Sequence, residues 1–170
     1  MSEKVFFSEK QKFNQWWLWL LLIGLNGMFI FKIVKQIYYK NIYATEVAID
    51  AEFTIGFSIV FLVTTLFYFF QLETIIKNDG IYVRFFPIHF VYKKYSWDTL
   101  EKCYIRKYNP LSEYGGWGIR MGLFGKGNAL NVSGNMGLQL EILNKTNLLI
   151  GTNNPDELKD VLIQLSRYKS

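Results

Sequence analysis

The sequence predicts an α+β membrane protein, in which a two-helix transmembrane hairpin precedes a small antiparallel sheet with one C-terminal helix. Three observations lead to this fold class. Two apolar runs without charged residues lie near the start of the chain, short alternating runs follow them, and an amphipathic stretch ends the chain. A helix of about 20 apolar residues crosses the roughly 30 Å hydrocarbon core of a bilayer, whereas alternation indicates half-buried strands.

The first apolar run starts at Phe13 and the second at Phe53. They predict transmembrane helices at about residues 13–34 and 53–72. A secretory signal is an alternative for the first run, but the run is longer than the roughly 7 to 15 residues of a typical signal core. We therefore expect both helices to be retained. The expected domains are an N-terminal tail with the hairpin, residues 1–72, and a sheet domain, residues 73–170.

After Trp16, Asn26 is the one strongly polar side chain within the first apolar run, and Gly24 and Gly27 lie close to it on either side. Small residues let two helix backbones approach closely, and an amide can donate a hydrogen bond across the interface. We therefore expect Asn26, Gly24 and Gly27 to form a helix–helix contact. Intramembrane ionisable residues are the usual mark of transport, and neither apolar core contains one.

The distribution of basic residues predicts the orientation of the hairpin. Five basic residues near its outer ends oppose three in and beside the connector between the helices. The five are Lys4, Lys10, Lys12, Lys77 and Arg84, and the three are Lys32, Lys35 and Lys40. By the positive-inside rule, both termini are expected in the cytoplasm. In a bacterial host, the membrane would then be the inner membrane. The single cysteine, Cys103, is what a reducing compartment predicts.

Seven short runs after the hairpin predict an antiparallel sheet, with Asn78-Asp79-Gly80 as a tight hairpin turn. The expected strands lie at about 73–77, 81–86, 89–96, 100–108, 129–132, 138–143 and 147–150. Asn154 and Pro155 then mark the start of a helix, as N-cap and first helical residue. Leu158 and Leu162 belong to its apolar face, which we expect to cover the open end of a strongly bent sheet.

Seven antiparallel strands and one helix, directly after a transmembrane hairpin, resemble the bacterial pleckstrin-homology-like (PH-like) membrane proteins. Three segments carry the resemblance, at residues 114–120, 131–135 and 150–158, and it covers about residues 71–168. It implies a PH-like seven-stranded bent sheet capped by one helix, and a membrane-associated binding role. It brings no catalytic residues to carry over.

Phosphoinositide-binding PH domains place a basic cluster on their first two strands and on the loop between them. Here that loop is Asn78-Asp79-Gly80, which argues against specific phosphoinositide binding. Lys93 and Lys94 remain candidates to meet anionic lipid headgroups. The formal net charge of +5 is interspersed with acids and lacks the basic stripe that nucleic-acid binding requires, so we expect no nucleic acid as a partner.

The glycine-rich segment 109–128 is the longest stretch without a predicted element. In a recognition loop, Trp117 anchors a partner and Arg120 offers a planar fork of donors. In a purely structural loop, Trp117 plugs the sheet and Arg120 pairs with Glu113 or Glu141. The sequence leaves both interpretations open. The candidate binding residues are Trp117, Arg120, Tyr114, Lys93 and Lys94.

No catalytic, metal or nucleotide motif is complete in this sequence. His89 is the only histidine, and Asp98 and Glu101 are more typical of a turn cap and an exposed acid than of a catalytic pair. We therefore expect a non-enzymatic binding or scaffold module without a cofactor, anchored in the lipid bilayer and bound to a protein partner. The alternative is an accessory subunit of an envelope transporter or membrane enzyme.

Overall fold

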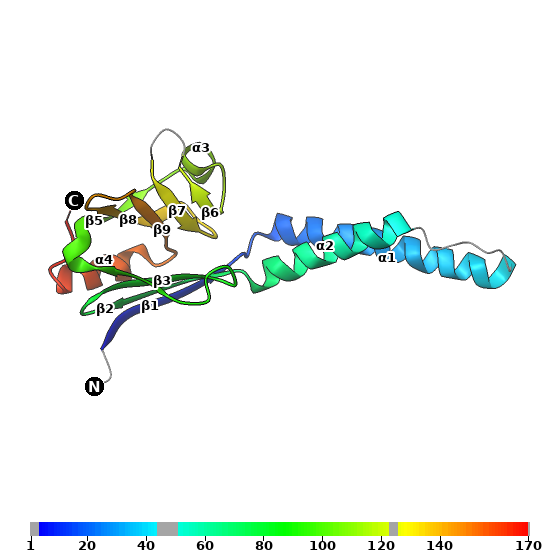
Figure 1. Cartoon of the computed structure of the whole chain (residues 1–170), viewed down its shortest axis with the longest axis horizontal. Helices are drawn as coiled ribbons and strands as arrows, with labels where there is room; N and C mark the ends of the chain where they lie inside the picture. Colours follow the sequence, from blue (N-terminus) through cyan, green and yellow to red (C-terminus); the bar gives the residue numbers. More distant parts are fainter. Residues whose placement is uncertain (1–3, 44–50, 123–125, 170) are drawn as a thin grey trace. The chain divides into compact units, whose positions relative to one another are not determined.

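The computed structural model describes residues 4–43, 51–122 and 126–169. The chain divides into two compact units (Figure 1). One unit, the helical hairpin, is Asn14–Phe69. The other, the sheet unit, combines Met1–Phe13 with Phe70–Ser170.

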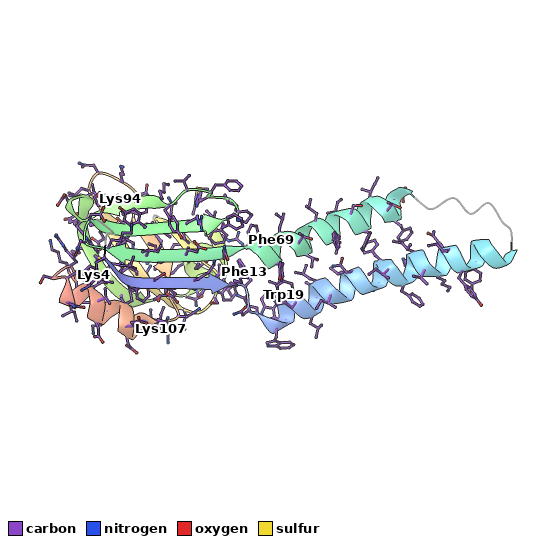
Figure 2. All side chains as sticks on the ribbon, turned by 90° about the horizontal axis from the view of Figure 1, so that it is seen from below. Lys4, Phe13, Trp19, Phe69, Lys94 and Lys107 are labelled. Atoms are coloured by element: carbon purple, nitrogen blue, oxygen red, sulfur yellow. The ribbon has the colours of Figure 1, made fainter. Side chains whose placement is uncertain are left out.

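The hairpin unit contains helices α1 (Trp16–Tyr43) and α2 (Ala51–Phe69). The segments Trp16–Tyr39 and Glu52–Phe69 are long and apolar enough to cross a membrane. Almost none of the residues in these two segments is buried inside the protein, as the side chains in Figure 2 show. A core helix of a soluble protein buries most of its apolar side chains, whereas these two helices leave most of theirs exposed.

The two helices pack against each other in antiparallel directions. The Asn26 side-chain amide donates a hydrogen bond to Thr64 Oγ1 at 2.8 Å. Closer to the connector, the Phe29 ring contacts the rings of Phe57 and Phe53, with centroid distances of 6.3 and 6.4 Å. One amide and a group of aromatic rings therefore join two otherwise apolar helices.

The first sheet contains four antiparallel strands in the order β1-β2-β3-β4. These are β1 (Val5–Lys12), β2 (Gln71–Lys77), β3 (Gly80–Phe86) and β4 (Lys93–Ser96). A 3-10 turn, η1 (Trp97–Thr99), then leads to the second sheet.

The second sheet has the order β5-β8-β9-β7-β6, in which only β7 and β9 are parallel. Its strands are β5 (Leu100–Lys107), β6 (Gly118–Met121), β7 (Asn128–Asn131), β8 (Met136–Ile142) and β9 (Leu148–Gly151). The short helix α3 (Pro110–Tyr114) follows β5, and α4 (Pro155–Gln164) follows β9.

Buried leucine, isoleucine and valine side chains from both sheets and from α4 form the core of the sheet unit. Helix α4 packs against β1 of the first sheet and against β5 and β8 of the second. Its Leu158 and Leu162 are fully buried. Burial of a leucine side chain stabilises a fold by about 1.5 to 3 kcal/mol, so these two residues help to hold the sheets together. The predicted C-terminal helix is confirmed, but it packs between strands of two sheets rather than over the open end of one.

The described residues form nine strands in two sheets rather than seven strands in one. All seven expected strands have counterparts, but residues 89–92 of the third lie in a loop, and only 93–96 form β4. Strands β1 and β6 were not predicted, and the sheet is interrupted at η1. The sequence pattern does not indicate β1, because its buried positions include the polar residues Glu9 and Gln11, which interrupt the usual alternation of apolar residues. The expected N-terminal tail is therefore corrected, since β1 pairs with β2 inside the sheet unit.

The polar side chains of β1 connect the two sheets. The Thr152 hydroxyl donates to Glu9 Oε2 at 2.7 Å, and the Asn153 N–H donates to Glu9 Oε1 at 2.8 Å. The Gln11 amide donates to the Gly151 carbonyl at 2.7 Å. All three partners lie at or just after the end of β9, so β1 fastens the first sheet to one end of the second.

We predict that replacing Glu9 with alanine lowers the free energy of unfolding of the full-length protein by about 2 to 4 kcal/mol, because the Thr152 hydroxyl and the Asn153 N–H lose a buried acceptor. Denaturant unfolding in detergent, followed by tryptophan fluorescence, measures the change. Glu101→Ala is the matched control, because Glu101 is an exposed strand residue. Equal stability of the two variants would contradict the connecting role of Glu9.

Candidate binding site

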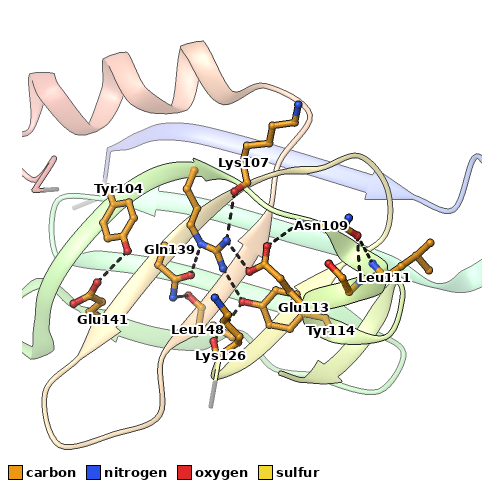
Figure 3. Close-up of polar contacts among 12 residues, drawn as sticks. Tyr104, Lys107, Asn109, Leu111, Glu113, Tyr114, Lys126, Gln139, Glu141 and Leu148 are labelled. Atoms are coloured by element: carbon orange, nitrogen blue, oxygen red, sulfur yellow. Dashed lines mark hydrogen bonds and ion pairs between the residues drawn. The ribbon is translucent and has the colours of Figure 1, made fainter. Parts of the chain in front are cut away.

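The glycine-rich segment predicted from the sequence begins with α3, which Arg106 of β5 holds on the sheet. Arg106 Nε donates to Gln139 Oε1 at 2.9 Å, and Nη1 donates to Glu113 Oε2 at 2.9 Å (Figure 3). The remaining nitrogen, Nη2, donates to the Tyr114 hydroxyl at 3.0 Å. The planar guanidinium thus connects β5, β8 and both of the last two residues of α3.

The sequence of α3 contains its own start and stop signals. Asn109 Oδ1 accepts hydrogen bonds from the N–H groups of Leu111 and Ser112, both at 3.1 Å, as an N-cap does. Glu113 Oε1 accepts the Asn109 N–H at 2.8 Å, so this side chain bonds back to the N-cap from the fourth helical position. Gly115 ends the helix in the left-handed region, with φ of 69°.

The charge of Glu113 is stabilised at this position. Burial disfavours its ionised form, but the Asn109 N–H and the Arg106 guanidinium together outweigh that effect, so the pKa of Glu113 is below its ordinary value. Burial raises the pKa of the neighbouring Tyr114 hydroxyl. The ion pair between Arg106 and Glu113 therefore holds α3 against the second sheet.

Tyr114, one of the expected binding residues, lies in the core. It is buried together with Tyr108, Ala129 and Leu149, and its ring meets that of Tyr108 edge to face at a centroid distance of 6.0 Å. Its hydroxyl accepts a hydrogen bond from Arg106. Tyr114 is therefore a core residue of the sheet unit, and its side chain is not exposed at the surface.

Trp117 and Arg120 lie together at the surface. The Trp117 ring is half-buried and its Nε1 donates to the Gly134 carbonyl at 3.2 Å, while Arg120 Nε donates to the Trp117 carbonyl at 2.9 Å. In the described part of the chain, Arg120 pairs with neither of the two acids considered from the sequence. Glu113 pairs with Arg106, and Glu141 accepts the Tyr104 hydroxyl at 3.0 Å.

Strand β6 forms an open edge of the second sheet. Among the described strands it pairs only with β7, so one row of its backbone groups has no strand beside it. Met121 is 83% exposed and Ile119 is 40% exposed. At the opposite edge, the N–H and the carbonyl of Cys103 on β5 both bond to Lys169, which partly covers that strand. We call β6, Gly118–Met121, together with Trp117 the β6 edge.

Lys93 and Lys94 lie on β4 of the first sheet and do not belong to the β6 edge. Lys93 lines an open cavity of about 480 Å³, together with Asn128 and Lys145. Lys94 pairs with Asp79, which also accepts the Tyr82 hydroxyl at 2.6 Å. The hydrogen bond with Asp79 raises the pKa of Lys94.

In the hairpin unit, Asn26 contacts α2 through Thr64, but its two neighbouring glycines do not take part. Gly24 and Gly27 are exposed, and a Cβ at either position would meet no atom within 4 Å. The close approach is instead at Gly56, where a Cβ would lie 3.1 Å from the Phe29 ring. Gly56, Arg106 and β6 are the features that the sequence analysis missed.

Comparisons with protein-family models, curated proteins and solved structures find no match to this chain. Among the described residues, no group of three His, Cys, Asp or Glu side chains is arranged to hold a metal ion. The candidate site therefore rests on the geometry of the β6 edge.

We predict that Glu113→Gln lowers the free energy of unfolding by about 1 to 3 kcal/mol at neutral pH, because a charged hydrogen-bond acceptor of Arg106 is lost. The folded-state pKa of Glu113 is lowered, so its ionised form stabilises the fold above the unfolded-state pKa. This stabilisation disappears as the pH falls through the folded-state pKa. Denaturant unfolding of both proteins over a pH series should show the difference shrinking in acid, and a constant difference would contradict the assignment.

Proposed function

We propose that the protein is a membrane-anchored, non-enzymatic binding module, whose β6 edge accepts an extended segment of a partner protein. Two apolar helices serve as the anchor, and the sheet unit serves as the binding part. The open β6 strand, which contains Arg120 and directly follows Trp117, is the single observation that carries the proposal.

An unpaired strand can bind a peptide by adding it to the sheet, with backbone hydrogen bonds for affinity and side-chain contacts for specificity. Side chains alternate along β6, so Ile119 and Met121 offer apolar contacts on one face and Arg120 offers donors on the other. The rigid ring of Trp117 lies next to the start of the strand, where an aromatic anchor contributes most to an interface. These features fit an extended segment with both apolar and acidic residues.

The proposal extends to fold family and location. A C-terminal helix that packs against two antiparallel-rich sheets supports a PH-like domain of the bacterial membrane-protein type. The excess of basic residues near the outer ends of the hairpin supports a cytoplasmic position for both termini at a bacterial inner membrane. Asn78-Asp79-Gly80 between β2 and β3, with Asp79 bound to Lys94, weighs against specific phosphoinositide binding.

A second candidate function is an accessory subunit of an envelope transporter or membrane enzyme. Gly24 and Gly27 favour it, because they leave one side of α1 open to the close approach of another helix. In that case the main contact lies within the bilayer and not at the β6 edge.

We expect the full-length protein to stay in the membrane fraction after extraction with alkaline carbonate, because both apolar segments are long enough to span the bilayer. In a bacterial host, alkaline phosphatase fused at Lys40 should be active, and phosphatase fused at the C-terminus should be inactive. Release by carbonate would contradict the anchor. Activity of the C-terminal fusion alone would reverse the orientation but leave the anchor in place.

Two methionines separate the candidate functions. Met121 is exposed on β6 and Met28 is exposed on α1. We expect a photoreactive amino acid at position 121 to crosslink a partner protein in native membranes, and the same amino acid at position 28 to give little product. Product from position 28 alone would favour the accessory subunit. In addition, Met121→Lys should weaken capture without changing stability, since this side chain makes few contacts in the fold.

A further inference from the structure

The loop between β3 and β4, residues 87–92, exposes several large apolar side chains. Val91 is 80% exposed, Phe90 is 74% exposed and Ile88 is 55% exposed. Three such residues in one short loop are unusual on a water-facing surface, where large apolar patches mark an interaction site. We call residues 87–92 the apolar loop.

The fold holds the apolar loop by its backbone. The His89 N–H donates to the Phe85 carbonyl at 2.8 Å, and Arg84 Nη1 donates to the Phe90 carbonyl at 3.3 Å. The apolar side chains of the loop are therefore exposed, while part of its backbone is hydrogen-bonded to strand β3.

A charged cluster on the first sheet supports the base of the loop. Glu73 accepts hydrogen bonds from Arg84 Nε at 3.1 Å and from the Tyr92 hydroxyl, and Lys10 Nζ lies 2.9 Å from its other oxygen. The Arg84 guanidinium lies over the Tyr92 ring at 4.5 Å. Burial disfavours the charge of Glu73, but its hydrogen bonds with Tyr92, Lys10 and Arg84 outweigh this effect and lower its pKa. The positive charge of Arg84 is thereby paired with the negative charge of Glu73.

Strand register places the apolar loop at one particular end of the first sheet. Phe86, directly before the loop, pairs with Gln71 of β2, and Gln71 pairs with Lys12 of β1. Adjacent strands lie about 4.8 Å apart, so these three residues span only about 10 Å. Gln71 follows the last residue of α2, Phe69, after one residue, and Lys12 precedes α1 by a few residues. The loop thus starts where the chain leaves the sheet for both apolar helices.

Aromatic packing fixes this end of the sheet. The Phe70 ring meets the ring of Phe13 at a centroid distance of 6.2 Å and the ring of Phe85 at 5.8 Å. Lys4 and Phe13 mark the two ends of β1 in Figure 2, and the chain leaves for α1 at the Phe13 end. The points at which the chain leaves and re-enters the sheet unit are therefore held next to the strand that carries the apolar loop.

We propose that the apolar loop inserts its side chains into the interfacial region of the bilayer crossed by α1 and α2, as a third lipid contact of the protein. This inference depends on the membrane anchor of the proposed function. The short connections at Lys12 and Gln71 hold the loop near the bilayer surface, and Ile88, Phe90 and Val91 enter it as interfacial anchors do. Lys93, exposed directly after the loop, meets anionic headgroups there.

The test places an environment-sensitive fluorophore on single cysteines of the full-length chain, reconstituted in phosphatidylcholine and phosphatidylglycerol vesicles that carry a spin-label quencher in their acyl chains. The only native cysteine, Cys103, is buried and is replaced by alanine. Probes at Val91→Cys and Ile88→Cys should shift to the blue and lose at least half of their emission to the quencher. The probe at Ile163→Cys should show neither effect.

Ile163 is the matched control because it is 53% exposed, close to the value for Ile88, and lies near the other end of the first sheet. There, Arg167 lies over the Trp97 ring and Trp97 Nε1 donates to the carbonyl of Asn78, in the turn between β2 and β3. If the protein floats with the vesicles but the loop probes behave like the Ile163 probe, the insertion is refuted and the anchor stands. If the protein does not float, both the anchor and the insertion are refuted.

Discussion

The pairing of β1 with β2 is the constraint on which the rest of the molecule depends. These strands are neighbours, and their register joins Lys12 to Gln71, so the whole hairpin leaves and re-enters the sheet unit across one strand spacing. A single membrane crossing would separate β1 and β2 on opposite faces of a bilayer. The number of crossings between them must therefore be even. Cleavage after α1, as in a secretory signal, would remove β1 from the sheet.

The inward face of β1 makes this constraint energetically important. Leucines in place of Glu9 and Gln11 would bury as easily, but they would not bond to Thr152, Asn153 and Gly151 at the end of β9. A buried polar group that is hydrogen-bonded favours the arrangement that keeps its partner in place, because loss of that partner leaves the group unsatisfied. The N-terminal strand thus fixes how the first sheet meets the second. Because α1 and α2 lie between β1 and β2 in the chain, β1 can pair with β2 only after both helices have been synthesised.

Local sequence patterns correctly predicted the elements in which the polarity of each residue matches its burial. Strands β3 and β8 alternate apolar and polar residues, and Asn154 and Pro155 mark the start of α4 where the structure places it. Strand β1 could not be found in this way, because Glu9 occupies a buried position through a partner on a distant loop. The residues of the candidate site show the same difference between local and distant contacts. Trp117 and Arg120 are close in sequence and meet, whereas Tyr114 of α3 is buried and bonded to Arg106, which reaches it from strand β5.

The β6 edge and the apolar loop both expose large apolar side chains, yet their backbones suit different surroundings. Lipid offers few hydrogen-bond partners, so a segment that enters it must satisfy its polar backbone groups within the protein. The apolar loop does this in part, through the N–H of His89 and the carbonyl of Phe90. Strand β6 instead presents a row of backbone groups along an open edge, which only water or another polypeptide can satisfy. The backbone, more than the side chains, therefore assigns the loop to lipid and the edge to protein.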